Sequence, residues 1–135
     1  MEQLLLHLVG DYLLQNDWMA NEKTKKILPA FIHAFIYSLP FILITTPLAA
    51  AVIFISHFLI DHFRLVKYFL RLKEWRWKTE WGYITTKKES NYYGKEVKPA
   101  WMWVWLMIIA DNTLHLIINY FSIKYISDSF ILGLI

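Results

Sequence analysis

The chain has 135 residues, of which 57% are hydrophobic and 18% are aromatic, and its formal net charge is +3. It contains no cysteine, which excludes disulfide frameworks and thiolate metal sites. The length fits one domain, and the mean hydropathy of +0.35 is high for a soluble one. There is room for about three or four apolar helices of about 20 residues, the length that crosses a bilayer.

The first predicted helix covers residues 4–20, and its polar side chains share one face. His7, Asp11, Gln15 and Trp18 recur every three to four residues, the rhythm of a helix with one polar side. A signal peptide is not predicted here, because the start lacks a basic stretch and the apolar part contains histidine and aspartate. We expect a short or tilted membrane helix that its neighbours hold in place.

The second and third predicted helices follow a lysine-rich connector at residues 21–26. The second covers residues 27–46 and contains Pro40, which we expect to kink the helix, as membrane bundles tolerate. The third covers residues 48–72. It begins with a long apolar run and is predicted to continue past Arg64 as an amphipathic helix.

Residues 74–98 form the one long polar segment, which mixes lysine and arginine with tryptophan and tyrosine. We interpret this segment as an interfacial loop attracted to anionic lipid head groups. The alternative is a lid or a substrate-gathering surface. The fourth predicted helix covers residues 99–125, and the apolar tail after it is too short to cross a membrane again.

The positive charges predict the orientation of this bundle. Thirteen of the 14 lysines and arginines fall in residues 23–26 or 64–98, and all seven tryptophans lie at or near these connectors. Four spans place both connectors on one side, which the positive-inside rule makes cytoplasmic, with both termini outside. This topology explains the charge pattern without a nucleic-acid partner. We therefore predict an all-α integral membrane bundle of about four helices, forming one domain over residues 1–135.

Three aspartates inside the predicted spans each have a histidine four residues away, which places each pair on one face of a helix. A given aspartate in a chain with five histidines has roughly a 7% chance of such a neighbour. Ionisable residues inside a membrane are costly, face the bundle interior and are usually functional. The three pairs are His7 with Asp11, His57 with Asp61, and Asp111 with His115.

These pairs predict a membrane-embedded site for a divalent metal ion. Histidine nitrogens and aspartate oxygens are natural ligands of Zn, Mn and Fe. The site is predicted to hold one or two ions. Seven candidates are more than one catalytic ion needs, and they suit two ions about 3.5–4 Å apart. The alternative is a set of interhelical salt bridges and hydrogen bonds without metal. The candidate ligands are His7, Asp11, His33, His57, Asp61, Asp111 and His115.

Other polar residues near these pairs have two interpretations each. Gln15 and Asn112 either orient a metal ligand or hydrogen-bond neighbouring helices. Arg64 either anchors a helix end in the head-group region or meets a phosphate. His33, taken alone, is more often a structural histidine, and His62 is interpreted as interfacial. A carboxylate not needed by the metal, Asp61 or Asp111, is predicted to act as general base.

Four pieces of the sequence resemble domain-of-unknown-function family 3307, whose members are small integral membrane proteins of bacteria and their phages. The pieces are HLVGDYLLQ at 7–15, His33, HFLIDHFR at 57–64 and DNTLH at 111–115. The resemblance covers nearly the whole chain, is weak in residues 74–98, and implies a prokaryotic inner membrane. Family members often carry Gln where Asn112 stands and Lys where Arg64 stands, and these departures leave the metal ligands intact. The family brings no established activity, and loosely resembles bacterial membrane proteins regarded as metal-dependent hydrolases.

The leading functional hypothesis is a metal-dependent hydrolase that acts on a lipid-linked or membrane-associated substrate, such as a phosphoester. Metal-activated water would be the nucleophile. A transport protein for protons or divalent cations is the second hypothesis, and with so few spans it would require an oligomer. The third is a non-enzymatic membrane adaptor with a structural His/Asp network. A di-iron oxidase would be expected to carry more histidines.

Overall fold

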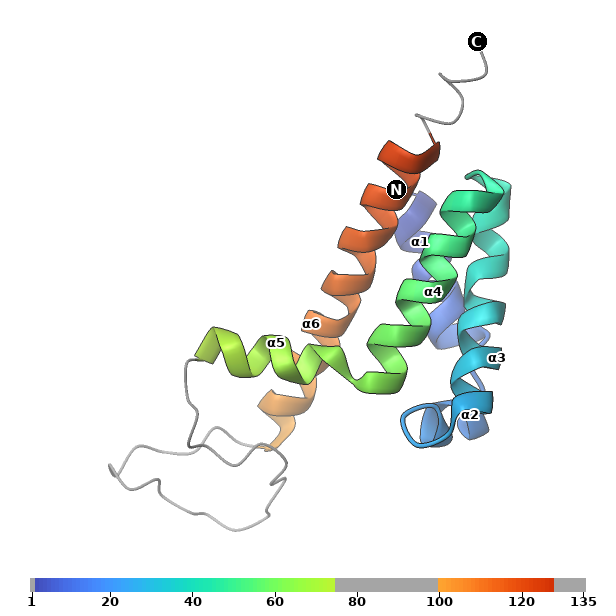
Figure 1. The fold of residues 1–135 in the computed structure, drawn as a ribbon. Coiled ribbons are helices and arrows are strands. Elements are labelled where there is room, and N and C mark those ends of the chain that lie inside the picture. Colours follow the sequence, from blue (N-terminus) through green and yellow to red (C-terminus); the bar gives the residue numbers. More distant parts are fainter. Residues whose placement is uncertain (1, 75–99, 128–135) are drawn as a thin grey trace.

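The structure of the protein is a computed structural model that describes residues 2–74 and 100–127 (Figure 1). Within these ranges the chain is helical and contains no strand, which confirms the predicted all-α class for the part described. The helices α1, α3, α4 and α6 run alongside one another, and α5 turns away from the end of α4 and crosses α6 (Figure 1). Most of the predicted loop at 74–98 and the C-terminal tail lie outside the described residues.

The first predicted helix is interrupted. Helix α1 (Glu2–Leu8) passes into a π-helical turn, η1 (Val9–Leu13), and α2 (Asp17–Glu22) starts after a break at residues 14–16. The break forms because Asn16 adopts an extended backbone and its side-chain oxygen accepts a hydrogen bond from the Met19 N–H at 2.9 Å. Asparagine is a strong helix N-cap, so it starts a new helix rather than continuing the old one.

The proline of the second predicted helix changes its geometry. Helix α3 (Ile27–Ser38) is followed by η2 (Leu39–Leu43), a 3₁₀ helix with Pro40 near its start. Proline has no N–H to donate to the preceding turn, and a tighter 3₁₀ turn is a common way to end an α-helix. The helical region therefore ends at Leu43, short of the predicted residue 46.

The third predicted helix divides into two. Helix α4 (Pro47–Phe63) starts after Thr46, whose hydroxyl accepts a hydrogen bond from the Ala49 N–H, and ends at Arg64. Arg64 has φ 53° and ψ 46°, a left-handed conformation that terminates an α-helix. Helix α5 (Leu65–Glu74) then leaves at a steep angle (Figure 1). The predicted continuous helix over 48–72 is wrong at this residue.

One described helical segment is long and apolar enough to cross a membrane. It is Val104–Ser127, formed by α6 (Ala100–Phe121) and the π-helical turn η3 (Ser122–Ser127). The segments Ile27–Leu43 and Pro47–Phe63 are apolar but shorter.

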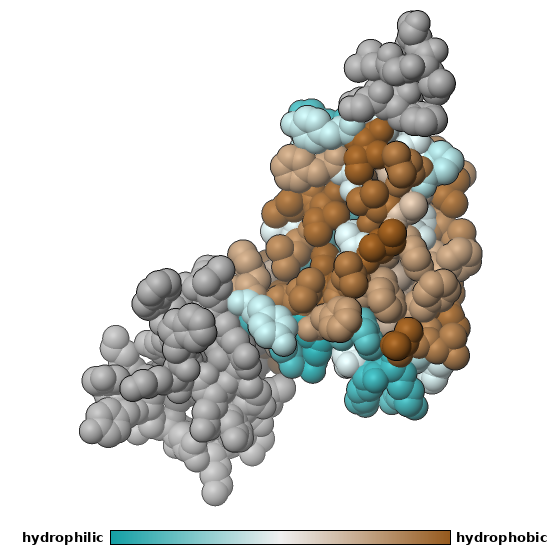
Figure 2. All heavy atoms as spheres, viewed as in Figure 1, coloured by the Kyte–Doolittle hydropathy of each residue, from teal (hydrophilic) through white to brown (hydrophobic). Residues whose placement is uncertain are grey.

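The outside of the bundle is apolar and much of its inside is polar. Leu43 is 84% exposed and Leu5 is 62% exposed, whereas His33 and His57 are buried. A small apolar core of Tyr37, Phe41 and Ile53 lies further along the bundle interior. In Figure 2, hydrophobic residues cover most of the visible face, and hydrophilic residues gather at the end where α2 lies. Contiguous exposed apolar surface of this kind marks contact with a membrane or a partner.

Candidate metal centre

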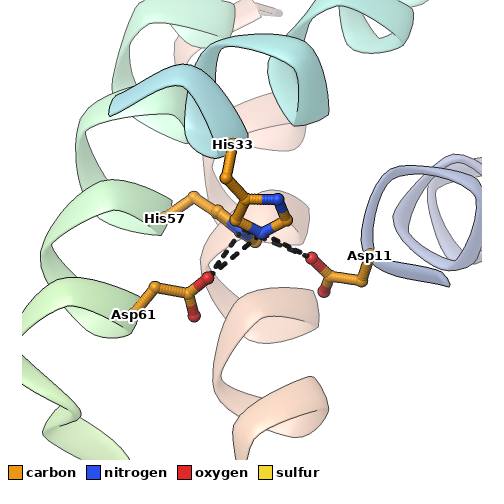
Figure 3. Close-up of side chains that lie close together, drawn as sticks. All are labelled: Asp11, His33, His57 and Asp61. Atoms are coloured by element: carbon orange, nitrogen blue, oxygen red, sulfur yellow. Dashed lines mark hydrogen bonds and ion pairs between the residues drawn. The ribbon is translucent and has the colours of Figure 1, made fainter. Parts of the chain in front are cut away.

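Three structural elements bring four histidine and aspartate side chains to one point in the bundle interior (Figure 3). Helix α4 contributes His57 and Asp61 one turn apart, and α3 contributes His33 opposite them. The π-helical turn η1 contributes Asp11. Such turns are rare and are frequently found at functional sites. The residues Asp11, His33, His57 and Asp61 are called the four-ligand set below.

The potential ligand atoms of this set lie at short and nearly equal separations. The Nε2 atoms of His33 and His57 are 3.0 Å apart. His33 Nε2 lies 3.2 Å from Asp11 Oδ1 and 3.2 Å from Asp61 Oδ2, and His57 Nε2 lies 3.3 Å from each of the same oxygens. All four atoms lie within 4.8 Å of one another.

These separations fit a tetrahedral metal ion. Bonds of about 2.0–2.1 Å from Zn²⁺ to nitrogen or oxygen place neighbouring ligand atoms roughly 3.3–3.4 Å apart. The five separations given above are 3.0–3.3 Å. Two histidine nitrogens with two carboxylate oxygens also form an established donor set for Zn, Mn or Fe. The residues present therefore fit a divalent ion, whose identity the donor set leaves open.

Hydrogen bonding alone leaves this set incompletely satisfied. A histidine Nε2 carries either one proton or one lone pair, yet each Nε2 here faces another nitrogen and two carboxylate oxygens. Asp11 Oδ1 is buried and has no hydrogen-bond donor among the described residues. A buried acceptor of this kind is costly, especially on a carboxylate. A cation bound among these atoms would satisfy all of them.

A second group shares Asp61 with the first. Its members Asp61, Asp111 and His115 also have ligand atoms within 4.8 Å of one another. Asp61 Oδ2 faces the four-ligand set, whereas Asp61 Oδ1 lies 3.2 Å from His115 Nε2. Asp111 Oδ2 lies 3.7 Å from the same nitrogen and is 31% exposed. A carboxylate whose two oxygens face two ligand groups has the arrangement that bridges a pair of ions.

The ring of Tyr37 fixes the position of His57. The two rings stack at a centroid distance of 3.6 Å with 17° between their planes. Gly10, next to Asp11 on η1, packs directly against the Tyr37 ring. A Cβ atom at position 10 would overlap this ring. The turn that carries Asp11 can therefore approach α3 closely only with glycine at position 10.

His7, predicted as a ligand, has other partners for both of its ring nitrogens. Nε2 lies 2.8 Å from Asn112 Oδ1, and Nδ1 lies 2.7 Å from the Tyr37 hydroxyl. The Asn112 amide donates in turn to the Tyr12 hydroxyl, and the Asn119 amide donates to Tyr37. His7 Nδ1 is also 3.4 Å from Asp11 Oδ2, so His7 lies beside the four-ligand set. We call His7, Tyr37, Asn112, Asn119 and Tyr12 the amide–tyrosine network.

Two further predicted site residues, Arg64 and Gln15, lie where helices end. Arg64 is exposed at the end of α4, and the cation that contacts Asp61 is Lys23, with Nζ 2.6 Å from Asp61 Oδ2. The predicted contact of Arg64 with a phosphate therefore stays a prediction, and the described cation at Asp61 is Lys23. Gln15 lies in the break between η1 and α2, and its Oε1 is buried without a donor among the described residues.

Three residues of the site are not evident from the His/Asp pairs: Tyr37, Asn119 and Lys23. Tyr37 follows His33 by four residues and Asn119 follows His115 by four, so the same spacing rule would have found both. Lys23 gives no such signal. In the sequence it is one of three neighbouring lysines in a polar connector, and only the fold distinguishes it from Lys25 and Lys26.

Comparison with known proteins identifies the family but no function. Neither the curated proteins nor the solved structures contain a match to this chain. The sequence model of the family described as "Protein of unknown function (DUF3307)" matches residues 1–127, which include every residue of both ligand groups. The resemblance found in the sequence is thereby confirmed, and the chain belongs to the DUF3307 family.

Proposed function

We propose that the protein is an integral membrane metal-dependent hydrolase that acts on a lipid-linked or membrane-associated substrate, such as a phosphoester. In this proposal α1, α3, α4 and α6 form the membrane bundle, and the two basic connectors lie on the cytoplasmic side of a prokaryotic inner membrane. The observation that carries the proposal is the convergence of the four-ligand set, in which the two histidine nitrogens lie 3.0 Å apart and each lies 3.2–3.3 Å from both carboxylate oxygens.

The depth of the site supports a substrate at the membrane surface. Asp61 lies in the last turn of α4, and His33 lies about 9 Å along α3 from its first residue, Ile27, at about 1.5 Å per residue. Both helix ends adjoin the basic connectors, at the end of the bundle where hydrophilic residues gather (Figure 2). The ligands are thus within reach of a lipid head group, whereas the middle of the bilayer lies further along the helices.

The residues of the two ligand groups can take different roles in hydrolysis. A bound divalent ion supplies a Lewis acid and lowers the pKa of a water molecule. Asp61 is surrounded by His33, His57 and Lys23, so it serves best as a ligand. Asp111 is the more accessible carboxylate, and it is the better candidate to take the proton of the attacking water and return it to the leaving group.

Elemental mass spectrometry of detergent-purified protein, prepared without chelators, tests the metal site. We expect near-stoichiometric Zn, Mn or Fe in the wild type, loss of that metal in His57→Ala, and retention in His62→Ala. His62 is a matched control because it lies on the same helix and its Nδ1 donates to the Lys23 carbonyl at 3.0 Å instead of facing the ligands. A folded, metal-free wild type would contradict the proposal.

If metal is present, hydrolysis of phospholipids and lipid phosphates is measured next, with Asp111→Asn as the inactive comparison.

Passage of protons or divalent cations is a second candidate, and one observation favours it. Polar contacts continue from Asp11 through His7 to Tyr37 and Asn119, away from the basic connectors and towards the other end of α6. Flux of protons or metal ions into liposomes separates the two candidates. Flux that is lost in His7→Ala, together with the absence of hydrolysis, would favour passage.

A further inference from the structure

The side chain of Lys23 reaches into the candidate metal centre. Its Nζ donates to Asp61 Oδ2 at 2.6 Å and lies 3.2 Å from His33 Nε2. Both of these atoms belong to the four-ligand set. The Lys23 side chain is 17% exposed, so it extends from the surface of the bundle to the ligands and lies at their entrance.

The backbone holds Lys23 in this place. Lys23 terminates α2, and its N–H donates to the Met19 carbonyl at 2.9 Å. Its own carbonyl accepts a hydrogen bond from His62 Nδ1 on α4. The connector between α2 and α3 is thus fastened to the last turn of α4, next to Asp61. The position of the lysine is built into the fold, while its long side chain can still rotate.

The neighbouring lysines behave differently. Lys26 and Lys25 pair with Glu22 at 2.8 Å and 3.4 Å, and both side chains are about two-thirds exposed, 68% and 65%. Surface pairs of this kind contribute little to stability, and their side chains remain in contact with solvent. One lysine of the connector is therefore directed inwards, and two are directed outwards.

Lys23 and a metal ion compete for the same atoms. The single lone pair of His33 Nε2 cannot bind a metal ion while it accepts a hydrogen bond from the Lys23 ammonium group. A divalent ion next to Asp61 would also repel the lysine at the short distance seen here. An ion that enters the four-ligand set must therefore displace the Lys23 ammonium, which the backbone keeps at the entrance.

We propose, building on the proposed function, that Lys23 is the anion-binding residue of this site. It occupies the ligand set when no metal is bound, and metal binding releases it to bind the phosphate group of a substrate. Ammonium groups on flexible stems are common phosphate ligands. The site would then accept a phosphate only after the metal is in place, whether that phosphate belongs to a lipid head group or to a soluble ester.

Amine labelling read by mass spectrometry tests this proposal directly. In detergent-solubilised, metal-stripped protein we expect Lys23 to react slowly with an amine-specific reagent. Addition of Zn²⁺ or Mn²⁺ should increase its labelling by about tenfold, because the ammonium then leaves its largely buried ion pair with Asp61. Lys26 is the matched control, and its labelling should not change. Unchanged labelling of Lys23 under conditions where the wild type binds metal would overturn the inference and leave the metal site intact.

A second arm identifies the anion. Inorganic phosphate, or vesicles of phosphatidylcholine with phosphatidate, is added to the metal-loaded protein, and renewed protection of Lys23 is expected. Protection by phosphatidate vesicles alone indicates a lipid source, and protection by both indicates the phosphate group itself. Protection by neither overturns the anion-binding role.

The variant Lys23→Met supplies an independent measurement, because it keeps the length of the side chain and removes its charge. We expect it to bind metal about tenfold more tightly than the wild type. We also expect its metal-loaded form to bind phosphate more weakly than the wild type does. Lys26→Met should match the wild type in both respects. Equal or weaker metal binding by Lys23→Met would contradict the competition. Absence of metal from wild type and variant alike would overturn the proposed function as well.

Discussion

Two buried polar clusters lie side by side in this bundle, and they differ in how completely their atoms are paired. In the amide–tyrosine network donors and acceptors can be assigned to every contact. The Asn119 amide donates to Tyr37, the His7 Nε2–H donates to Asn112 Oδ1, and the Asn112 amide donates to Tyr12. With its proton on Nε2, neutral His7 accepts at Nδ1 from the Tyr37 hydroxyl.

The four-ligand set is paired less completely. Its two histidine nitrogens face each other at 3.0 Å and share the same two carboxylate oxygens, and Asp11 Oδ1 is left without a donor. Buried polar groups in a membrane bundle must be satisfied internally. The network achieves this with hydrogen bonds and is explained as a structural connection between helices. The four-ligand set instead draws the Lys23 ammonium onto Asp61 and His33, and it leaves Asp11 Oδ1 without a donor among the described residues. This contrast distinguishes a candidate metal site from a structural hydrogen-bond network.

Replacement of Asp61 should have the largest effect on metal binding. Asp61 belongs to both ligand groups, so Asp61→Asn should weaken metal binding by at least about 100-fold at both positions. Asp111→Asn should leave the ion of the four-ligand set in place, because Asp111 does not belong to that set. Metal-to-protein ratios from elemental mass spectrometry check both expectations. A full complement of metal in Asp61→Asn would show that the ion, if present, lies elsewhere.

Gly10→Ala should disturb both clusters at once. The added methyl group would overlap the Tyr37 ring, which stacks on His57 and carries the central hydroxyl of the network. Overpacking of this kind costs about 1–3 kcal/mol. We expect a lower unfolding midpoint in detergent, followed by circular dichroism, together with weaker metal binding. Wild-type stability would mean that η1 packs less closely against α3 than the structure shows.

Tyr37→Phe should affect the network and spare the metal ligands. The variant keeps the ring that stacks on His57 and removes the hydroxyl, which leaves His7 Nδ1 and the Asn119 amide without this partner. Loss of a buried hydrogen-bonding partner costs about 1–3 kcal/mol in unfolding free energy. Metal binding should change by less than about tenfold. Tyr12→Phe is the matched control, because Tyr12 is 54% exposed and water can replace its hydroxyl.

The spacing of residues predicted much of this arrangement, and the physical reasons for the exceptions are local. The His/Asp pairs followed from helical periodicity, and the structure brings Asp11, His33, His57, Asp61, Asp111 and His115 together. The break at Asn16 was missed because an apolar window hides a cap that depends on one side-chain hydrogen bond. The role of Lys23 depends on the angle between α2 and α4, which periodicity within one helix does not contain.

The spacing of residues does not predict whether His7 faces the ligands. Its position relative to Asp11 is the same as that of His57 relative to Asp61, yet it hydrogen-bonds Tyr37 and Asn112 from other helices. Which of two equivalent pairs faces the ligands depends on the rotation of each helix about its axis. Tertiary packing sets that rotation, so a single sequence predicts the set of candidates better than the members that meet.

Arg64→Gly should produce the smallest effect, and in the opposite direction. Arg64 has a left-handed backbone at the end of α4, which costs a non-glycine residue about 1–2 kcal/mol. Glycine removes that cost but loses more conformational entropy on folding, so the net gain in unfolding free energy should be about 0.5–1 kcal/mol. Arg64→Ala removes the same side chain without relieving the backbone, and it should match the wild type in stability. Both variants should retain metal, because Lys23 rather than Arg64 contacts Asp61. A loss of metal or of hydrolysis in both variants, with stability unchanged in Arg64→Ala, would show that the Arg64 side chain contributes to the site.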